Sequence, residues 1–233
     1  MSQSLSAPSR SALIAFILAM AVVVVCSNVL VNFPVMVEVG SVNLGDLLTW
    51  GAFTYPAAFL ITDLTNRRFG PSKARRVVFV GFALAVVCSI IVPQLLFNMG
   101  LFPFEMSTSR LARIAVASGT AFLLAQLLDV LIFDRLRRGE WWKPPLVSSL
   151  IGSTLDTVLF FTIAFAAGFV FLGENDGFAL ENAPFLAISA TEAPRWMSWA
   201  IGDLGVKILM GLVMLIPYSV LRNVIAPKDA VAA

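Results

Sequence analysis

The sequence predicts an all-α membrane protein with six transmembrane helices and both termini in the cytoplasm. Of its 233 residues, 59% are hydrophobic and only 13% are charged, and the mean hydropathy is +0.90. A soluble core cannot bury that much apolar surface. The apolar residues gather in runs of roughly 17 to 25, the length that crosses a hydrocarbon core about 30 Å thick. These runs lack the alternation typical of a membrane β-barrel.

Each predicted span is an apolar run with its own boundaries. The first is longer than the apolar part of a signal peptide and no small-residue cleavage site closes it, so we expect it to stay in the mature protein. The second is short and borrows Gly45 and Thr62 at its ends. Together the runs form one transmembrane domain, residues 12–222. The runs are Ala12–Phe33, Leu47–Ile61, Val77–Phe97, Leu111–Phe133, Leu146–Leu172 and Met197–Leu221.

The basic residues predict the orientation, because segments rich in Lys and Arg remain in the cytoplasm. With the N-terminus inside, 12 of the 16 basic residues are cytoplasmic: Arg10, five in 62–76, four in 134–145, Arg222 and Lys228. Three spans on each side of the middle outer loop then have opposite orientations, which permits a 3+3 inverted arrangement. The cytoplasmic segments are 1–11, 62–76, 134–145 and 223–233, and the outer loops are 34–46, 98–110 and 173–196.

Residue types that are missing exclude several kinds of chemistry. The chain has no histidine, so a zinc site or a proton relay built on imidazole is excluded. Cys26 and Cys88 both lie within predicted spans and lack metal-ligand spacing, so we interpret them as packing residues. No GxxxxGK[ST] loop is present to hold a nucleotide. We therefore expect no cofactor, and ATP-driven work would need another subunit.

Four ionisable residues lie inside predicted spans: Asp129, Asp156, Asp203 and Lys207. A charge at bilayer depth costs several kcal/mol, so such residues face a protein interior, a hydrated cavity or each other. Asp156 and Lys207 each lie roughly 15 Å deep at 1.5 Å per helical residue, near the midplane. Asp203 is one turn from Lys207 on the same helix face, a favourable pairing. Asp129 lies nearer the cytoplasmic end of its span.

Polar residues form stripes on two of these spans, and two interpretations of them stay open. Ser149, Gly152, Ser153, Asp156 and Thr157 share one face of the fifth span. Small and polar residues also hold membrane helices together, so packing accounts for the serines and Thr157 taken singly. A polar site is the interpretation favoured for Asp156 and for Gln126 and Asp129 of the fourth span. Asp203 and Lys207 fit a structural ion pair and a ligand site equally well.

The predicted loop 62–76 carries five basic residues and one acid at the membrane edge. Orientation and contact with anionic lipid explain the basic residues, which include Arg67, Arg75 and Arg76. They do not explain Asp63, which we expect to cap the helix end or to reach an arginine.

Several short motifs, taken together, resemble the signature of the vitamin uptake transporter (VUT) family, the bacterial queuosine-precursor transporters. The resemblance covers roughly Leu47 to Leu221 and weakens toward Lys207. The motifs are Ile61-Thr62-Asp63-Leu64-Thr65, Phe69-Gly70, Ala74-Arg75-Arg76, Arg113-Ile114-Ala115, Gln126-Leu127-Leu128-Asp129-Val130 with Phe133 and Arg135, Trp141-Trp142, Ser148-Ser149, Gly152, Asp156-Thr157 and Phe160-Phe161.

The resemblance implies a six-helix carrier in the bacterial inner membrane. Its cargo would be a purine-like base, 7-cyano- or 7-aminomethyl-7-deazaguanine, imported for the modification of tRNA. Membrane lipid would surround the chain, and no direct contact with nucleic acid is implied. A homodimer stays open, because no strong motif supports one.

The chemistry of such a base suggests roles for the polar residues. A carboxylate can accept the adjacent N–H groups of a guanine-like edge, while an amide or ammonium can donate to its carbonyl. We therefore predict that Asp156 recognises the base and that Gln126 and Lys207 assist, in a cavity between the last three spans. The remaining predicted lining residues are Ser149, Ser153, Asp203, Asp129 and Phe160, with Phe161 and Trp199 as further aromatic candidates.

The same hypothesis places a gate at the cytoplasmic side, made of Asp63 and Asp129 with Arg67, Arg75 and Arg76. Other classes of function stay open. The chain could be the substrate-binding subunit of an ATP-driven vitamin importer, docking through Ala15 and Ala19. It could also be a scaffold whose buried charges are structural. An intramembrane aspartyl protease is disfavoured, because Ala200 breaks the GxGD pattern before Asp203.

Overall fold

Long apolar helices build the molecule, because a helix satisfies its own backbone N–H and C=O groups where no water is present. The computed structural model describes residues 10–40, 42–103 and 105–225. The prediction of an α-helical membrane protein is confirmed, since five described helices are long and apolar enough to cross a membrane. They are α1 (Arg10–Leu30), α4 (Pro71–Asn98), α5 (Thr108–Leu136), α6 (Lys143–Phe165) and α8 (Arg195–Val213).

Two predicted spans are interrupted, each at a proline. The second contains α2 (Gly51–Thr54) and α3 (Ala57–Phe69), separated by Tyr55 and Pro56. The last is divided into α8 and α9 (Leu215–Ile225), with Pro217 in the first turn of α9. Proline lacks an N–H and its ring clashes with the carbonyl four residues earlier, so helical hydrogen bonding is broken at both points. The count of six spans therefore stays a prediction.

The segment 62–76, expected to be a loop, is helical on both sides of Gly70. α3 continues to Phe69, and α4 begins at Pro71. Gly70 has φ 80°, a value that a residue without a Cβ adopts easily, and Pro71 suits the first turn of the next helix. The apolar pattern ended at Ile61 because the polar residues that follow it face the interior of the bundle rather than lipid.

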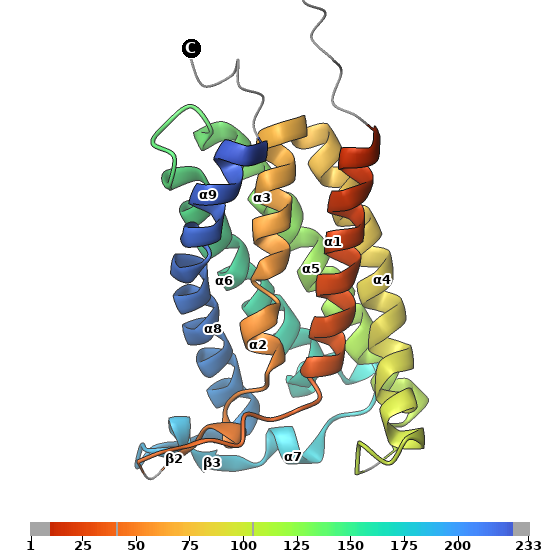
Figure 1. The fold of residues 1–233 in the computed structure, drawn as a ribbon. Helices are drawn as coiled ribbons and strands as arrows, with labels where there is room; N and C mark the ends of the chain where they lie inside the picture. Colours follow the sequence, from red (N-terminus) through yellow and green to blue (C-terminus); the bar gives the residue numbers. More distant parts are fainter. Residues whose placement is uncertain (1–9, 41, 104, 226–233) are drawn as a thin grey trace, which may run out of the picture.

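Two short antiparallel hairpins lie at one end of the bundle (Figure 1). We call this the hairpin end, and the opposite end, where α1 begins and α9 ends, the terminal end. In the first hairpin Val39 pairs with Val42, and in the second Ala183 pairs with Ala193. The strands are β1 (Glu38–Val39), β2 (Val42–Asn43), β3 (Asn182–Pro184) and β4 (Glu192–Pro194), and the short helices are η1 (Leu44–Asp46), η2 (Ala167–Leu172), α7 (Gly177–Leu180) and η3 (Phe185–Ala187). Predicted loop 173–196 is thus largely ordered into short elements.

The helices run alternately between the two ends and pack around a core of small and branched side chains. Met20, Val77, Val78 and Phe122 are among its fully buried members. At Gly152 a Cβ would lie 2.7 Å from the Phe59 ring, so the glycine lets α3 approach α6. Outward positions such as Ile14, Leu18 and Val22 of α1 are exposed and apolar, as contact with lipid requires.

The predicted tails lie mostly outside the described residues. Only Arg10 and Ser11 of the segment 1–11 and only 223–225 of the segment 223–233 are described, so Lys228 falls outside.

Candidate functional site

A cavity of about 530 Å³ extends from the hairpin end to the middle of the bundle. Residues of α1, α2, α4, α5, α6 and α8 line it, so it is not confined to the last three spans. Asp46, Asp176 and Arg195 lie around its mouth, whereas Asp156 and Lys207 lie at its inner end. The volume is within the range of about 300 to 1,000 Å³ typical of sites for small molecules.

Charged side chains of α6 and α8 form the inner end of the cavity. Lys207 Nζ lies 2.8 Å from Asp156 Oδ2 and 2.5 Å from Asp203 Oδ2. The lysine also donates to Thr157 Oγ1 at 3.2 Å, and Thr157 donates to Asp203 Oδ2 at 2.9 Å. We call these four residues the lysine cluster. Helical spacing places Asp203 beside Lys207, and the polar stripe of α6 presents Asp156 and Thr157 to them.

The hydrogen-bond inventory of the lysine cluster leaves acceptors for a ligand. An ammonium has three donors, and those of Lys207 are all used within the cluster. No described residue donates to Asp156 Oδ1 or to Asp203 Oδ1. Two carboxylates and one ammonium carry a net charge of −1 when all are ionised. The inner end of the cavity therefore favours a ligand that presents N–H donors.

Aromatic side chains cover one wall of the cavity. Phe160 and Phe161 meet edge to face with ring centroids 5.1 Å apart, and Phe165 meets Trp199 at 5.6 Å. Trp199 also donates from Nε1 to the Asp46 backbone oxygen at 2.9 Å, which fixes the indole at the wall. Such rings can stack on a flat heterocycle. The structure thus places the predicted Phe160, together with Phe161 and Trp199, at the cavity.

Other lining residues escaped the sequence analysis. Asn28 and Asn32 of α1 line the cavity, and Ser89 of α4 donates to Asn28 Oδ1 at 3.2 Å. The sequence did contain a signal for this lining, because the two asparagines stand four residues apart in an otherwise apolar run. Tyr55, at the interruption between α2 and α3, also lines the cavity, and its ring centroid lies 5.7 Å from Lys207 Nζ.

Arginines at the hairpin end hold the mouth of the cavity in shape. Arg110 forms an ion pair with Asp176. Arg113 is fully buried and donates to the backbone oxygens of Ile163 at 2.8 Å and Ala166 at 2.6 Å. The end of α6 leaves carbonyls without helical partners, so Arg113 binds them. The sequence had indicated Arg113 only as part of the motif Arg113-Ile114-Ala115.

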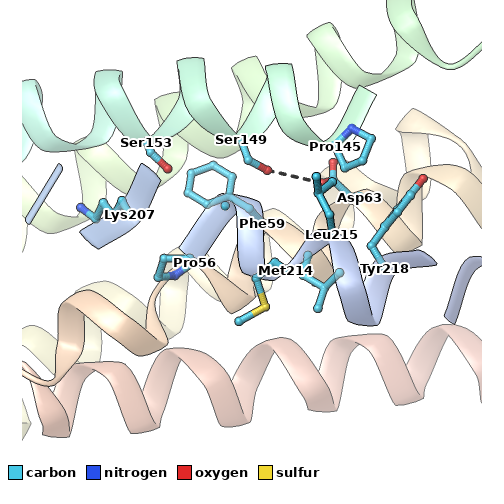
Figure 2. Close-up of a pocket in the computed structure, with 12 residues that line it drawn as sticks. Pro56, Phe59, Asp63, Pro145, Ser149, Ser153, Lys207, Met214, Leu215 and Tyr218 are labelled. Atoms are coloured by element: carbon cyan, nitrogen blue, oxygen red, sulfur yellow. Dashed lines mark hydrogen bonds between the residues drawn. The ribbon is translucent and has the colours of Figure 1, made fainter. Parts of the chain in front are cut away.

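A second, much smaller pocket of about 10 Å³ lies toward the terminal end. Its volume suffices for about one water molecule. Figure 2 shows Ser153 and Ser149 directed from α6 into the space between Lys207 and Asp63. Ser149 Oγ lies 3.5 Å from Asp63 Oδ2. Lys207 lines both this pocket and the large cavity.

Three predicted site residues lie beyond the large cavity. Asp63, Gln126 and Asp129 are buried, and none of them lines it. Gln126 Oε1 accepts from Thr62 Oγ1 at 2.6 Å, which joins α5 to α3. Asp129 faces Asp63 and Ser148, yet neither of its carboxylate oxygens has a hydrogen-bond partner among the described residues.

The predicted gate residues separate into two groups. Arg67 lies against the hydroxyl of Tyr218, a residue that is also close to Asp63. Arg75 and Arg76 are exposed on α4, and Arg75 Nε bonds the Pro71 oxygen at 3.3 Å. The structure thus brings Asp156, Asp203, Lys207 and Phe160 together at the cavity. Asp63, Asp129 and Ser149 lie between the cavity and the terminal end, with Ser153 between the two groups. Within the described segments no group of three or more His, Cys, Asp or Glu could hold a metal ion.

Known proteins match most of the chain. Residues 49–221 match the family model described as "Putative vitamin uptake transporter". The "Queuosine precursor transporter" of Escherichia coli (strain K12) is 36% identical over 214 residues, which cover 89% of this chain and 85% of that protein. The "Probable queuosine precursor transporter" of Haemophilus influenzae (strain ATCC 51907 / DSM 11121 / KW20 / Rd) is 34% identical over 218 residues, covering 88% and 84%. That of Bacillus subtilis (strain 168) is 28% identical over 128 residues, covering 50% and 56%. No solved structure matches.

Proposed function

Because the chain belongs to the vitamin uptake transporter family, we propose that it carries a queuosine precursor across a membrane. It is a transporter and not an enzyme. The cavity of about 530 Å³ that ends at the lysine cluster is the observation that carries the proposal. The cargo we propose is 7-cyano- or 7-aminomethyl-7-deazaguanine, imported through the bacterial inner membrane.

The free acceptors and the aromatic wall suit such a base. A guanine-like edge presents adjacent N–H donors, and Asp156 Oδ1 and Asp203 Oδ1 are unoccupied acceptors at the inner end of the cavity. Phe160, Phe161 or Trp199 would stack on the flat ring system. Asp156 and Asp203 therefore recognise the cargo in this proposal, and Lys207 holds both carboxylates in place.

The remaining predicted residues act away from the bound base in this conformation. Gln126 holds α5 against α3 through Thr62. Ser149 and Ser153 line the small pocket that leads toward the terminal end. Asp63 and Asp129 are buried beyond the inner end of the cavity, and Arg67 lies beside Tyr218 on the same side, so we assign these three residues to the gate. Arg75 and Arg76 lie on the exposed face of α4, where they would meet anionic lipid or open water.

The proposed topology has six crossings, with α2 and α3 together forming the second. The basic residues of the terminal end support a cytoplasmic location for that end, and with this orientation the cavity opens outward. Transporters commonly form their sites at interrupted helices near the midplane, and Tyr55 at the interruption of α2 and α3 borders Lys207. The transport cycle would close the hairpin end over the base and open the terminal end.

The test is uptake of labelled 7-cyano-7-deazaguanine by cells that cannot make the compound. Asp156→Asn and Asp203→Asn each remove a charge-assisted hydrogen bond worth about 1.5 to 3 kcal/mol, so uptake at low substrate concentration should fall about 10- to 100-fold. Thr154→Val is the matched control, because Thr154 is exposed on α6 and bonds only its own helix. Normal uptake by both asparagine variants would overturn the site assignment.

Purified protein in liposomes distinguishes the rival functions. A carrier takes up the base without ATP or another protein, whereas a binding subunit of an ATP-driven importer does not. A scaffold would show neither uptake nor a thermal shift on addition of the base.

A further inference from the structure

A second pair of acids lies outside the cavity, between the lysine cluster and the terminal end. Asp63 of α3 is 1% exposed and Asp129 of α5 is 0% exposed. Hydrogen bonds join the two helices on either side of these acids, from Thr62 Oγ1 to Gln126 Oε1 at 2.6 Å and from Asn66 Nδ2 to the Val130 oxygen at 3.0 Å, so the two carboxyl groups face each other. We propose that Asp63 and Asp129 together hold one exchangeable proton, and that binding and release of this proton drive import. The inference rests on the proposed transport function and adds the coupling ion to it.

No cation of the described residues neutralises the pair. In the described part of the chain, neither acid forms an ion pair with Lys or Arg. Two carboxylates that face each other away from water cannot both be ionised at moderate cost. A proton held between them removes the repulsion and supplies the donor that Asp129 lacks, since neither Asp129 oxygen has a hydrogen-bond partner among the described residues.

The charged and titratable groups around the pair are all engaged elsewhere. Arg67 of α3 lies against the Tyr218 hydroxyl of α9, and Arg222 stacks on Trp141 with its Cζ 4.6 Å from the ring centroid. Arg137 of α5 donates to the Asn66 and Arg67 backbone oxygens. Lys207 of α8 lies in the lysine cluster. The polar groups of α6 that face Asp63 are the hydroxyls of Ser148 and Ser149, at 3.4 and 3.5 Å.

The small pocket offers a route for the proton on the cavity side. The small pocket has room for about one water molecule and connects Lys207 with Asp63 along Ser153 and Ser149 (Figure 2). Hydroxyl groups and a water molecule can each accept one proton and pass another on. Because Lys207 also borders the large cavity, the pair exchanges protons with the hairpin side in this conformation.

Unused polar atoms lie beside the pair. Among the described residues, Asn66 Oδ1 and Gln126 Nε2 are buried without hydrogen-bond partners. Unpartnered buried groups are rare in native structures and call for an explanation. They supply the partners that the acids need when the proton leaves and the terminal end opens. A proton taken up from the hairpin side is then released at the terminal side together with the base.

The experiment uses purified full-length protein in liposomes and measures two activities with labelled 7-cyano-7-deazaguanine. Exchange of labelled for unlabelled base across the membrane needs no net proton movement. Accumulation against a gradient needs it, and a pH difference of about one unit supports about tenfold accumulation for one proton per base. Wild-type protein should show both. Asp63→Asn and Asp129→Asn should each retain exchange and lose accumulation, and addition of the base should no longer acidify the lumen.

Asp134→Asn is the matched control, an acid on the same helix as Asp129 that pairs with Arg137 at 3.1 Å and is 39% exposed. It should accumulate the base like wild-type protein. Accumulation by both acid-pair variants, loss of exchange in both, or accumulation that follows a sodium gradient instead of a pH gradient would each overturn the proton proposal. Failure of wild-type protein to exchange the base would overturn the transport function itself.

Discussion

At the scale of the residue, a single buried ammonium organises the site. Lys207 is 5% exposed and contacts Asp156 and Asp203, which belong to different helices. Bringing the three charges out of water is costly, and their mutual attraction offsets that cost only while all three are present. The lysine therefore has a structural role as well as its position beside the cargo.

Lys207→Met should destabilise the protein by about 3 to 5 kcal/mol, because it leaves two buried carboxylates without a counter-charge. Asp156→Asn in the same chain should restore part of the loss. Thermal unfolding in detergent measures both effects. Lys143→Met is the control, since Lys143 is 48% exposed and its pair with Glu140 contributes only about 0 to 1 kcal/mol. Equal melting temperatures for the two lysine variants would contradict this account.

Some residue contacts could be predicted from the sequence and others could not. Spacing of four residues brought Asp203 beside Lys207, and the polar face of α6 brought Asp156 toward them. The helical period also predicted that Gln126 faces inward, and this residue is buried. The period cannot tell whether an inward face lines a cavity or a dry interior. Its partner, Thr62, lies 64 positions away in the chain, so local pattern carries no trace of the contact.

At the scale of the element, glycines set how closely helices approach around the cavity. A Cβ on Gly51 of α2 would lie 2.8 Å from Val31 Cα, a backbone atom that cannot move aside independently. Gly51 and Val31 both line the cavity. The contact thus links the packing of the interrupted second span to the width of the site.

Gly51→Ala should destabilise the protein by about 1 to 3 kcal/mol through overpacking and should lower uptake. Gly205→Ala provides the comparison, because a Cβ at that position of α8 meets nothing within 4 Å. There alanine should stabilise the helix by about 0.5 to 1 kcal/mol. Melting temperature and uptake of labelled base check both variants, and a stable, fully active Gly51→Ala protein would refute the packing argument.

Element boundaries show where apolar pattern fails as a guide. The sequence analysis ended the second span at Ile61, yet α3 runs on to Phe69. Thr62, Asp63, Thr65 and Asn66 are all buried against neighbouring helices. A hydropathy profile detects segments that suit contact with lipid. It therefore misses the part of a helix whose polar residues face the protein interior.

At the scale of the whole molecule, the large cavity lies toward the hairpin end of the described bundle, and only a pocket of about 10 Å³ lies between Lys207 and Asp63 on its terminal side. The alternation of loops rich in Lys and Arg with loops that contain few of them predicts which end faces the cytoplasm. All-helical architecture and membrane crossing followed from composition and run length. The participation of α1 and α4 in the cavity did not, because their lining residues are few and scattered among apolar ones.

Single cysteines in a background without Cys26 and Cys88 test the orientation. Thr191→Cys, near the second hairpin, should react in intact cells with a thiol reagent that cannot cross the membrane. Gly139→Cys, between α5 and α6, should react only after permeabilisation, because the terminal end is predicted to face the cytoplasm. Both positions are exposed in the structure. The reverse labelling pattern would invert the proposed direction of the open cavity.

Lys207 forms part of the wall between two chambers of very different size. Cargo whose carbonyl competed for the ammonium would draw it away from its present acceptors, and the partition would loosen as the base settled. Binding of the base and opening of the wall between the two chambers would then both depend on Lys207. In the empty carrier Lys207 would keep its present acceptors, and the release of a proton on the terminal side would wait for the base.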